Sequence, residues 1–171
     1  VTGPMARTAK DVALMLEAVC GPSPFSPLSQ SVERKPFVSA VEKGIPSGLR
    51  VAYCPDIAGI GVDEQIEHIC RKASFEMSPA GVRVEEVELD LSFGCSAFQA
   101  LRGLWMVVQQ FSRLDKLEEF GDNLGGNVRA GLALKAEELG EAERIRGRIW
   151  ELFQDLLGDF DHLCTPCMAL S

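Results

Sequence analysis

Within residues 1–21, a predicted helix carries an apolar side chain at every position from Val12 to Val19 except Glu17. Thr8 can cap the N-terminus of a helix, with Asp11 three residues later in a capping-box arrangement. Gly21, followed by a proline, favours the end of that helix. Because the apolar residues surround the helix axis on almost every side, we expect this helix to be buried on most of its faces. Residues 22–48 are predicted to form a loop, since prolines and serines dominate residues 22–36.

Residues 49–91 predict a strand, a helix and a second strand. The first strand alternates from Leu49 to Tyr53, and Asp63 is a plausible N-cap for the helix that follows. In the second strand the alternation slips by one residue at Glu85-Glu86, which indicates a bulge or an edge. A strand, helix and strand within this length are typical of a βαβ-like unit and of an α/β fold. The helix carries an apolar stripe of Ile66, Ile69, Cys70, Ala73 and Met77, and the second strand carries Val82, Val84, Val87 and Leu89.

Residues 92–171 are predicted to be mainly helical and to end in a strand. Two sets of apolar residues recur at helical spacing, separated by a glycine-rich break at Gly121, Gly125 and Gly126. Residues 160–164 predict a short strand before a Thr-Pro pair. Acidic and basic residues three positions apart, Glu141 with Arg144 and Glu143 with Arg146, indicate a solvated outer face on the second helix. The first apolar set is Phe98, Leu101, Leu104, Trp105, Val108 and Phe111, and the second is Ala142, Ile145, Ile149, Phe153 and Leu156.

The overall composition is that of a soluble globular chain with an acidic surface. The 171 residues are 46% hydrophobic and 25% charged, with a formal net charge of -8 and a sequence pI of about 4.8. Such a surface repels phosphate backbones and anionic lipids, which argues against nucleic acid and membranes as partners. No uncharged apolar run approaches the roughly 20 residues that span a bilayer. The chain also opens without the pattern of a secretion signal, so we expect a cytoplasmic protein.

Six cysteines are scattered at irregular spacing, which favours free thiols in a reducing compartment over a disulfide framework. The pair Cys164-Thr-Pro-Cys167 also permits a thiol-redox or zinc interpretation. A structural zinc site needs a second pair of ligands at similar spacing, and the sequence holds no other CxxC or CxxH. A low thiol pKa of the thioredoxin type needs a helix N-terminus, whereas this pair follows a predicted strand. We therefore expect no metal and no cofactor.

Three stretches carry a resemblance to a known family. The first is Gly3-Pro4-Met5-Ala6-Arg7-Thr8 with the apolar helix after it, and the second is residues 48–56 with the strand at 82–89. The third is Gly131-Leu132-Ala133-Leu134, the long Glu/Arg helix and residues 159–166, which end in Thr165-Pro166. In this order and spacing they resemble the amidase signature family of amide-bond hydrolases.

The resemblance implies a mixed β-sheet flanked by helices and an acyl-enzyme mechanism. In that family a lysine acts through one serine as the base for a second, nucleophilic serine, and a glycine- and serine-rich segment forms the oxyanion hole. This chain contains no such double-serine run, and none of its lysines matches the catalytic position. We therefore expect no catalytic residue here. Both ends look like cuts through a longer protein, so residues 1–171 are expected to be a single partial amidase domain.

Several residues are candidates for secondary roles implied by the resemblance. Phe98 and Trp105 lie where the family shapes its acyl pocket, although an aromatic stripe at helical spacing is also typical of a core. Arg129 precedes an expected turn at Gly131-Leu132, near which family members that act on glutamine carry an arginine that binds a substrate carboxylate. The alternative is that Arg129 is a solvated surface residue. Met5, Arg7 and Thr165 are candidate structural residues near the active site. Arg7 has the alternative of pairing with Asp11.

The leading interpretation is a piece of an amidase that acts on a small-molecule amide in the parent enzyme. The alternatives are a non-catalytic binding or structural module, such as an amidotransferase A-subunit-like piece, and a thiol-redox or metal protein built on Cys164 and Cys167. The exposed apolar faces expected at the two ends also predict self-association, so a homo-oligomer is a further expectation.

Overall fold

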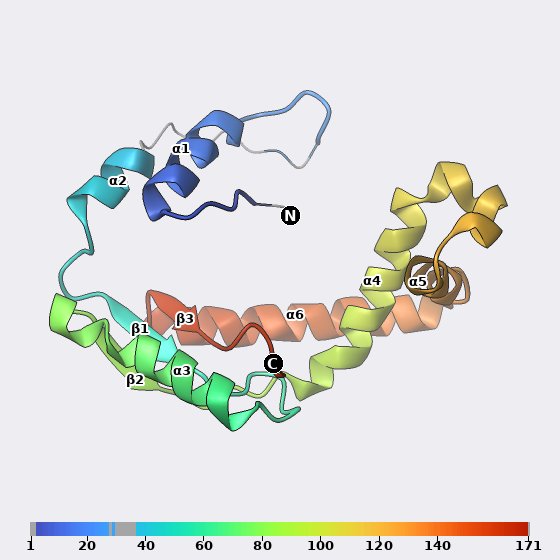
Figure 1. Cartoon of the computed structure of the whole chain (residues 1–171). Coiled ribbons are helices and arrows are strands. Elements are labelled where there is room, and N and C mark those ends of the chain that lie inside the picture. Colours follow the sequence, from blue (N-terminus) through green and yellow to red (C-terminus); the bar gives the residue numbers. More distant parts are fainter. Residues whose placement is uncertain (1–2, 28, 30–36, 171) are drawn as a thin grey trace. The chain divides into compact units, whose positions relative to one another are not determined.

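The structure is a computed structural model that describes residues 3–27, 29 and 37–170. Its elements follow one another along the chain as shown in Figure 1. They belong to two compact units, Val1–Leu49 and Arg50–Ser171, which are described separately. The one-domain organisation expected from the sequence stays a prediction. None of the described helices has the combination of length and apolar character that crossing a bilayer requires.

The first unit pairs the helix α1 (Ala9–Val19) with the short helix α2 (Phe37–Lys43). The predicted N-cap is confirmed, because the Thr8 side chain accepts a hydrogen bond from the Asp11 N–H at 3.2 Å. Two polar contacts join the helices: Lys10 Nζ lies 2.7 Å from a Glu42 carboxylate oxygen, and the Val38 N–H donates to Glu17 at 3.0 Å.

Two expectations for this unit are wrong. The helix α2 lies inside residues 22–48, which were expected to be a loop throughout. Residues 28 and 30–36 of the expected loop lie outside the described residues. Helix α1 was expected to be buried on most faces, yet Ala13 is its one buried residue. A seven-residue partner covers only one side of α1, so Leu14, Met15 and Val19 are 60%, 44% and 70% exposed.

The second unit is built on a three-stranded parallel sheet in the order β2-β1-β3. The strands are β1 (Arg50–Tyr53), β2 (Arg83–Glu86) and β3 (His162–Cys164). The β1–β2 register runs without interruption from Arg50 opposite Arg83 to Tyr53 opposite Glu86. Of the two alternatives for the slipped alternation, the edge is therefore confirmed and the bulge is wrong. The central strand is buried from Val51 onward, as expected for a strand paired on both sides.

Helix α3 (Glu64–Phe75) connects β1 to β2 and completes the predicted βαβ unit. Its N-cap is confirmed, because the Asp63 carboxylate accepts from the N–H groups of Gln65 and Ile66 at 2.9 and 3.4 Å. The predicted apolar stripe is only partly right. Ile69 is 57% exposed, whereas Ser74 is buried at 8%, so the covered face is rotated away from the stripe expected from the sequence.

A polar cluster holds helix α3 to the sheet. The Arg71 guanidinium pairs with Glu67 one turn earlier at 2.6 Å and with Glu86 on the edge strand β2. It also lies 5.5 Å from the centroid of the Tyr53 ring, which is fully buried on β1. The hydrogen bonds from Arg71 lower the pKa of Glu86, and burial raises the pKa of Tyr53 to about 12. One arginine thus links α3 to two neighbouring strands.

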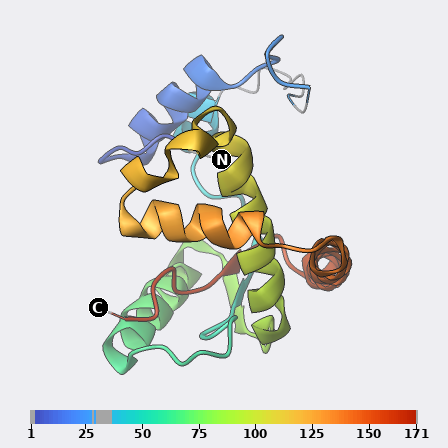
Figure 2. The ribbon, with the colours of Figure 1, turned by 90° about the vertical axis from the view of Figure 1, so that its right-hand side faces the viewer.

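The remainder of the second unit is helical. It contains α4 (Cys95–Gln109), α5 (Asp122–Leu132), α6 (Ala136–Asp159) and three short 3-10 segments: η1 (Ser78–Ala80), η2 (Ser92–Gly94) and η3 (Phe111–Glu119). In Figure 2, α4 lies between α5 on one side and α6, seen end-on, on the other. The predicted long helix with Glu141–Arg144 and Glu143–Arg146 pairs is confirmed as α6, with N···O distances of 2.9 and 2.5 Å. The α/β class and the helix-rich second half are confirmed.

The predicted glycine-rich break and turn are wrong in this region. Gly121 is the N-cap of α5, but Gly125 and Gly126 lie inside that helix, and Gly131-Leu132 forms its last turn. Gly125 and Gly131 are both buried, so these two glycines serve close packing instead of ending the helix.

Candidate functional site

The exposed face of α4 carries the two aromatic residues predicted to shape a pocket. Phe98 is 61% exposed and Trp105 is 53% exposed, seven residues and about two turns apart. The buried residues of α4 are instead the small ones, Ala97 and Gly103. An apolar stripe that the described residues leave uncovered is a surface available to a ligand or to another protein segment. Arg102 lies next to it, with its guanidinium carbon 5.8 Å from the centroid of the Phe98 ring.

A glycine-to-glycine contact fixes how α4 and α5 cross. A Cβ built on Gly131 of α5 would lie 2.2 Å from the carbonyl oxygen of Gly103 on α4. The contact is also tight at Gly103, where a Cβ would lie 3.0 Å from the Cα of Gly131. Backbone atoms cannot rotate away as side chains do, so only glycine on both helices permits this approach. The contact sets the position of the α5 residues relative to the aromatic face of α4.

Arg129 lies in the last turn of α5 and is exposed. Its side chain runs back along the helix, with Nη1 3.1 Å from the position of a Cβ on Gly125. Because Gly125 has no side chain, the Arg129 guanidinium can lie close to α5 there. Over the described part of the chain, no hydrogen bond or ion pair engages the Arg129 side chain, so its charge is available to a ligand.

A shallow polar pocket of about 400 Å³ lies between α4 and α5. Of its lining residues, the sequence analysis named only Gly126, as part of a glycine-rich break. The pocket's polar lining is Gln99, Arg102, Asp122, Asn123 and Asn127. A cation, a carboxylate and several amides at one opening can orient a small polar group by hydrogen bonds. Gln99 and Arg102 lie three residues apart on one side of α4. This i,i+3 spacing is the sequence signal that could have predicted them as a pair of polar pocket residues.

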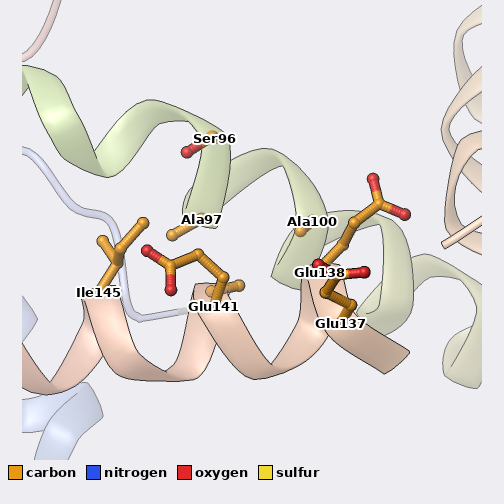
Figure 3. A pocket seen from close by; sticks show the side chains of 8 residues that line it. Ser96, Ala97, Ala100, Glu137, Glu138, Glu141 and Ile145 are labelled. Carbon is orange, nitrogen blue, oxygen red and sulfur yellow. The ribbon is translucent and has the colours of Figure 1, made fainter. Parts of the chain in front are cut away.

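A second pocket of about 320 Å³ lies between α4 and α6 (Figure 3). Ser96 projects from α4, and Glu137, Glu138 and Glu141 project from the first turns of α6. The hydrogen bonds from Arg144 lower the pKa of Glu141, so this carboxylate stays ionised and already has a cationic partner. Within residues 3–27, 29 and 37–170, no three or more His, Cys, Asp or Glu side chains are placed to hold a metal ion.

Thr165 lies just beyond the carboxyl end of β3 and is exposed. At this edge the Cys54 N–H donates to the Cys164 carbonyl at 2.9 Å, which extends the pairing of β1 with β3. The chain then crosses the edge of the sheet, and the Asp63 N–H donates to the Ala169 carbonyl at 2.8 Å. Ligands of parallel α/β sheets bind outside the carboxyl ends of the strands, so Thr165 occupies a position suited to a site. Cys164 and Cys167 are both free thiols.

The two remaining candidates belong to the first unit. Met5 is 90% exposed, and Arg7 is exposed directly before the N-cap of α1. The alternative pairing of Arg7 with Asp11 does not occur among the described contacts; instead the Thr8 hydroxyl donates to the Asp11 carboxylate at 2.8 Å. The structure therefore brings Phe98 and Trp105 together on one helix and Arg129 onto its neighbour. Met5, Arg7 and Thr165 are not part of that helix pair.

Comparison with known proteins agrees with the resemblance in sequence. The profile of the Amidase family matches residues 1–171. The chain is 30% identical over 173 residues to an acylamidase of Rhodococcus erythropolis, in a match that covers 98% of this chain and 35% of that protein. It is 28% identical over 190 residues to the A-subunit of the glutamyl-tRNA(Gln) amidotransferase of Rubrobacter xylanophilus, in a match that covers 96% of this chain and 39% of that protein.

Solved structures show the same fold. A bacterial aryl acylamidase of the amidase signature enzymes superposes with a TM-score of 0.83 and 21% identity over 98% of this chain and 36% of its own. A protein of the vestigial complex that reveals the evolutionary origins of an s-triazine catabolic enzyme gives a TM-score of 0.75 and 19% identity over 92% of this chain and 34% of its own. The chain thus spans roughly a third of the proteins that it matches. Because the family profile matches from the first residue to the last, this chain belongs to the amidase family.

Proposed function

We propose that these 171 residues are a non-catalytic part of an amide-bond hydrolase, in which catalysis depends on a lysine and two serines outside them. One observation carries the proposal: the chain belongs to the amidase family over its whole length yet contains no glycine- and serine-rich double-serine run. The acyl-enzyme chemistry of the family needs that nucleophile and its oxyanion hole. The substrate is proposed to be a small-molecule amide, and residues 1–171 are proposed to belong to one amidase domain.

Within this proposal the helix pair α4–α5 forms one wall of the substrate pocket. Phe98 and Trp105 would contact the apolar part of the substrate, since both are exposed on one helix. Arg129 would meet a polar or anionic substituent, since this residue is exposed on the adjacent helix. The roles proposed for Met5, Arg7 and Thr165 are structural. The proposed compartment is the cytoplasm, which the six free cysteines support.

The amidotransferase alternative rests on a specific observation, the 28% identity to an amidotransferase A-subunit over 96% of this chain. An amidotransferase subunit would release ammonia for use by a partner protein. An acylamidase would release ammonia or an amine to solution. The two are separated by the substrate: hydrolysis of glutamine favours the amidotransferase, and hydrolysis of simple amides favours the amidase. The thiol-redox alternative would require Cys164 and Cys167 to cycle between thiols and a disulfide.

The test compares the purified 171-residue chain with a protein extended to include the catalytic segment. We expect no release of ammonia or aniline from alkyl amides or anilides by the chain alone, and turnover by the extended protein. In the latter, Trp105→Ala and Phe98→Ala should lower kcat/KM by about tenfold, which corresponds to about 1.4 kcal/mol of lost transition-state binding. The matched control is Phe25→Ala, an aromatic residue 95% exposed in the other unit, which should leave kcat/KM unchanged.

Turnover by the isolated chain that disappears when one of its own residues is changed would refute the proposal. Equal kcat/KM for the α4 variants and the control would leave the family assignment intact and refute the pocket wall alone.

A further inference from the structure

The spacing of α4 and α5 depends on a contact between two glycines. Of the glycines in this chain, Gly131 leaves the least room for a side chain, since a Cβ there would lie 2.2 Å from the Gly103 carbonyl oxygen. An ordinary contact of a Cβ atom is 3.4 Å or longer. A single added methyl group at Gly131 therefore requires the two helices to move apart by about 1 Å.

The same contact lies at the polar pocket between these helices. Gly103 itself lines this pocket, which has a volume of about 400 Å³. A group bound there can be held from both sides only while the helices keep their spacing, because a donor and an acceptor about 3.6 Å apart no longer form a hydrogen bond. The polar side chains of the pocket are Gln99 and Arg102 on α4, and Asp122, Asn123 and Asn127 on α5.

The two helices offer complementary polar groups to this pocket. Arg102 and Asp122 line it from α4 and α5, and neither side chain belongs to an ion pair or a hydrogen bond among the described residues. The Asn127 Nδ2 donates to the Asn123 carbonyl at 2.6 Å, so the side-chain oxygen of Asn127 is left to accept. Donors thus come from α4 and acceptors from α5. An uncharged group that both accepts and donates, such as a carboxamide, fits between them.

Arg102 connects this pocket with the aromatic face of α4. Phe98, Arg102 and Trp105 follow at spacings of four and three residues, so they share one side of the helix. The Arg102 guanidinium carbon lies 5.8 Å from the centroid of the Phe98 ring. A ligand whose apolar part lies against the two aromatic rings therefore has its polar substituent beside Arg102.

We propose that Gly103 and Gly131 are positioning residues that set the width of the α4–α5 pocket and so select the substrate. The selected substrate is an amide that carries an aromatic group and, on that group, a carboxamide substituent. Arg102 donates to the oxygen of this substituent, and Asp122 accepts from its N–H. The inference rests on the proposed amidase function and on α4 and α5 as a wall of its pocket.

The test uses the protein extended to include the catalytic segment. It compares acetanilide with acetanilide that carries a carboxamide group in the para position, by the release of the aniline from each. The wild type should have the higher kcat/KM for the carboxamide substrate. Gly131→Ala should lower that value about tenfold, mainly through KM, because one helix loses its hydrogen bonds to the substituent. For acetanilide, which keeps its apolar contact with α4, the change should be less than about twofold.

Gly94→Ala is the matched control for a general disturbance of packing. A Cβ on Gly94 would lie 2.9 Å from Cδ1 of Ile149 on α6, on the side of α4 that faces away from α5 (Figure 2). This variant should leave the ratio of the two kcat/KM values unchanged. Arg102→Met should show the same selective loss as Gly131→Ala, and the double variant should lose little more than either single variant, because both changes remove one interaction.

The possible outcomes separate this inference from the proposed function. An equal fall for both substrates in Gly131→Ala would show that the glycine contact serves stability alone and overturns the inference. A wild type without preference for the carboxamide substrate, or additive losses in the double variant, overturns it as well. In each of these cases the proposed function stands. If the wild-type extended protein hydrolyses neither substrate, the proposed function itself is refuted, and this inference with it.

Discussion

Replacing Gly131 by alanine should destabilise the second unit, although alanine is the better helix former. The new Cβ would lie 2.2 Å from the Gly103 carbonyl oxygen, 2.5 Å from its carbonyl carbon and 2.8 Å from a methyl group of Val107. Two of these three atoms belong to the backbone of α4, so relief requires that the two helices move apart. That movement loosens the packing around Val128, which is fully buried on α5.

The magnitude follows from two opposing effects. Overpacking of a close contact costs about 3 kcal/mol, at the upper end of its usual range, because backbone atoms must shift. The change from glycine to alanine within a helix returns about 1 kcal/mol. The net loss is about 2 kcal/mol of unfolding free energy, which lowers Tm by about 4–8 °C for a domain of this size. Gly103→Ala should cost less, because its Cβ would lie 3.0 Å from the nearest atom.

Urea denaturation followed by helical ellipticity measures these differences. Gly126→Ala is the matched control on the same helix, and there the propensity gain should appear alone as a stabilisation of up to about 1 kcal/mol. The expected order of stability is Gly126→Ala, wild type, Gly103→Ala and Gly131→Ala. If Gly131→Ala is as stable as the Gly126→Ala control, the helices do not approach through these glycines and the reasoning is refuted.

Three further predictions concern the sheet, a helix cap and the thiols. Tyr53, the single tyrosine of the chain, should ionise near pH 12 when folded and near its ordinary pKa of 10.0 when unfolded, as followed by ultraviolet absorbance. Because the pKa of Tyr53 is raised in the folded state, the stabilisation from its protonated form is complete below pH 10 and is lost as the pH rises towards 12. Identical titration curves of Tyr53 in the folded and unfolded chains would contradict this prediction. Asp63→Ala should cost about 1 kcal/mol in urea denaturation by removing the cap of α3, whereas Gln65→Ala should cost little. With a thiol reagent, buried Cys54 should react only after unfolding, whereas the exposed thiols should react in the native chain; early reaction of all six would contradict the buried position of β1. The exposed cysteines are Cys20, Cys95 and Cys167.

Local physics explains which predictions from the sequence were confirmed. The caps Thr8 and Asp63 act on N–H groups two or three residues away, so the starts of α1 and α3 could be predicted without any tertiary information. The i,i+3 pairs on α6 are equally local. The family resemblance also rests on short segments in a fixed order, and the match over residues 1–171 confirms it.

The candidate site was only partly predictable, because a sequence pattern does not tell which partner covers a face. Phe98 and Trp105 share a helical face, and that pattern fits a core as well as a pocket; their exposure distinguishes the two within this chain. Arg102 and Gln99 reach the α4–α5 pocket only because α5 crosses α4 beside them. That crossing joins segments far apart in sequence.

The sequence by itself determined the family, the α/β class, the strand-helix-strand unit and the caps that begin α1 and α3, since each depends on short segments and on interactions over a few residues. Only the tertiary structure showed the structural role of the glycines and which helix faces are exposed. Gly125 and Gly126 looked like a break, and Gly131 like a turn, until the structure placed all three inside α5. The physical reason is that glycine is compatible both with a chain break and with a close contact between helices. For Gly131, the contact is recognised only from the position of Gly103, 28 residues earlier in the chain.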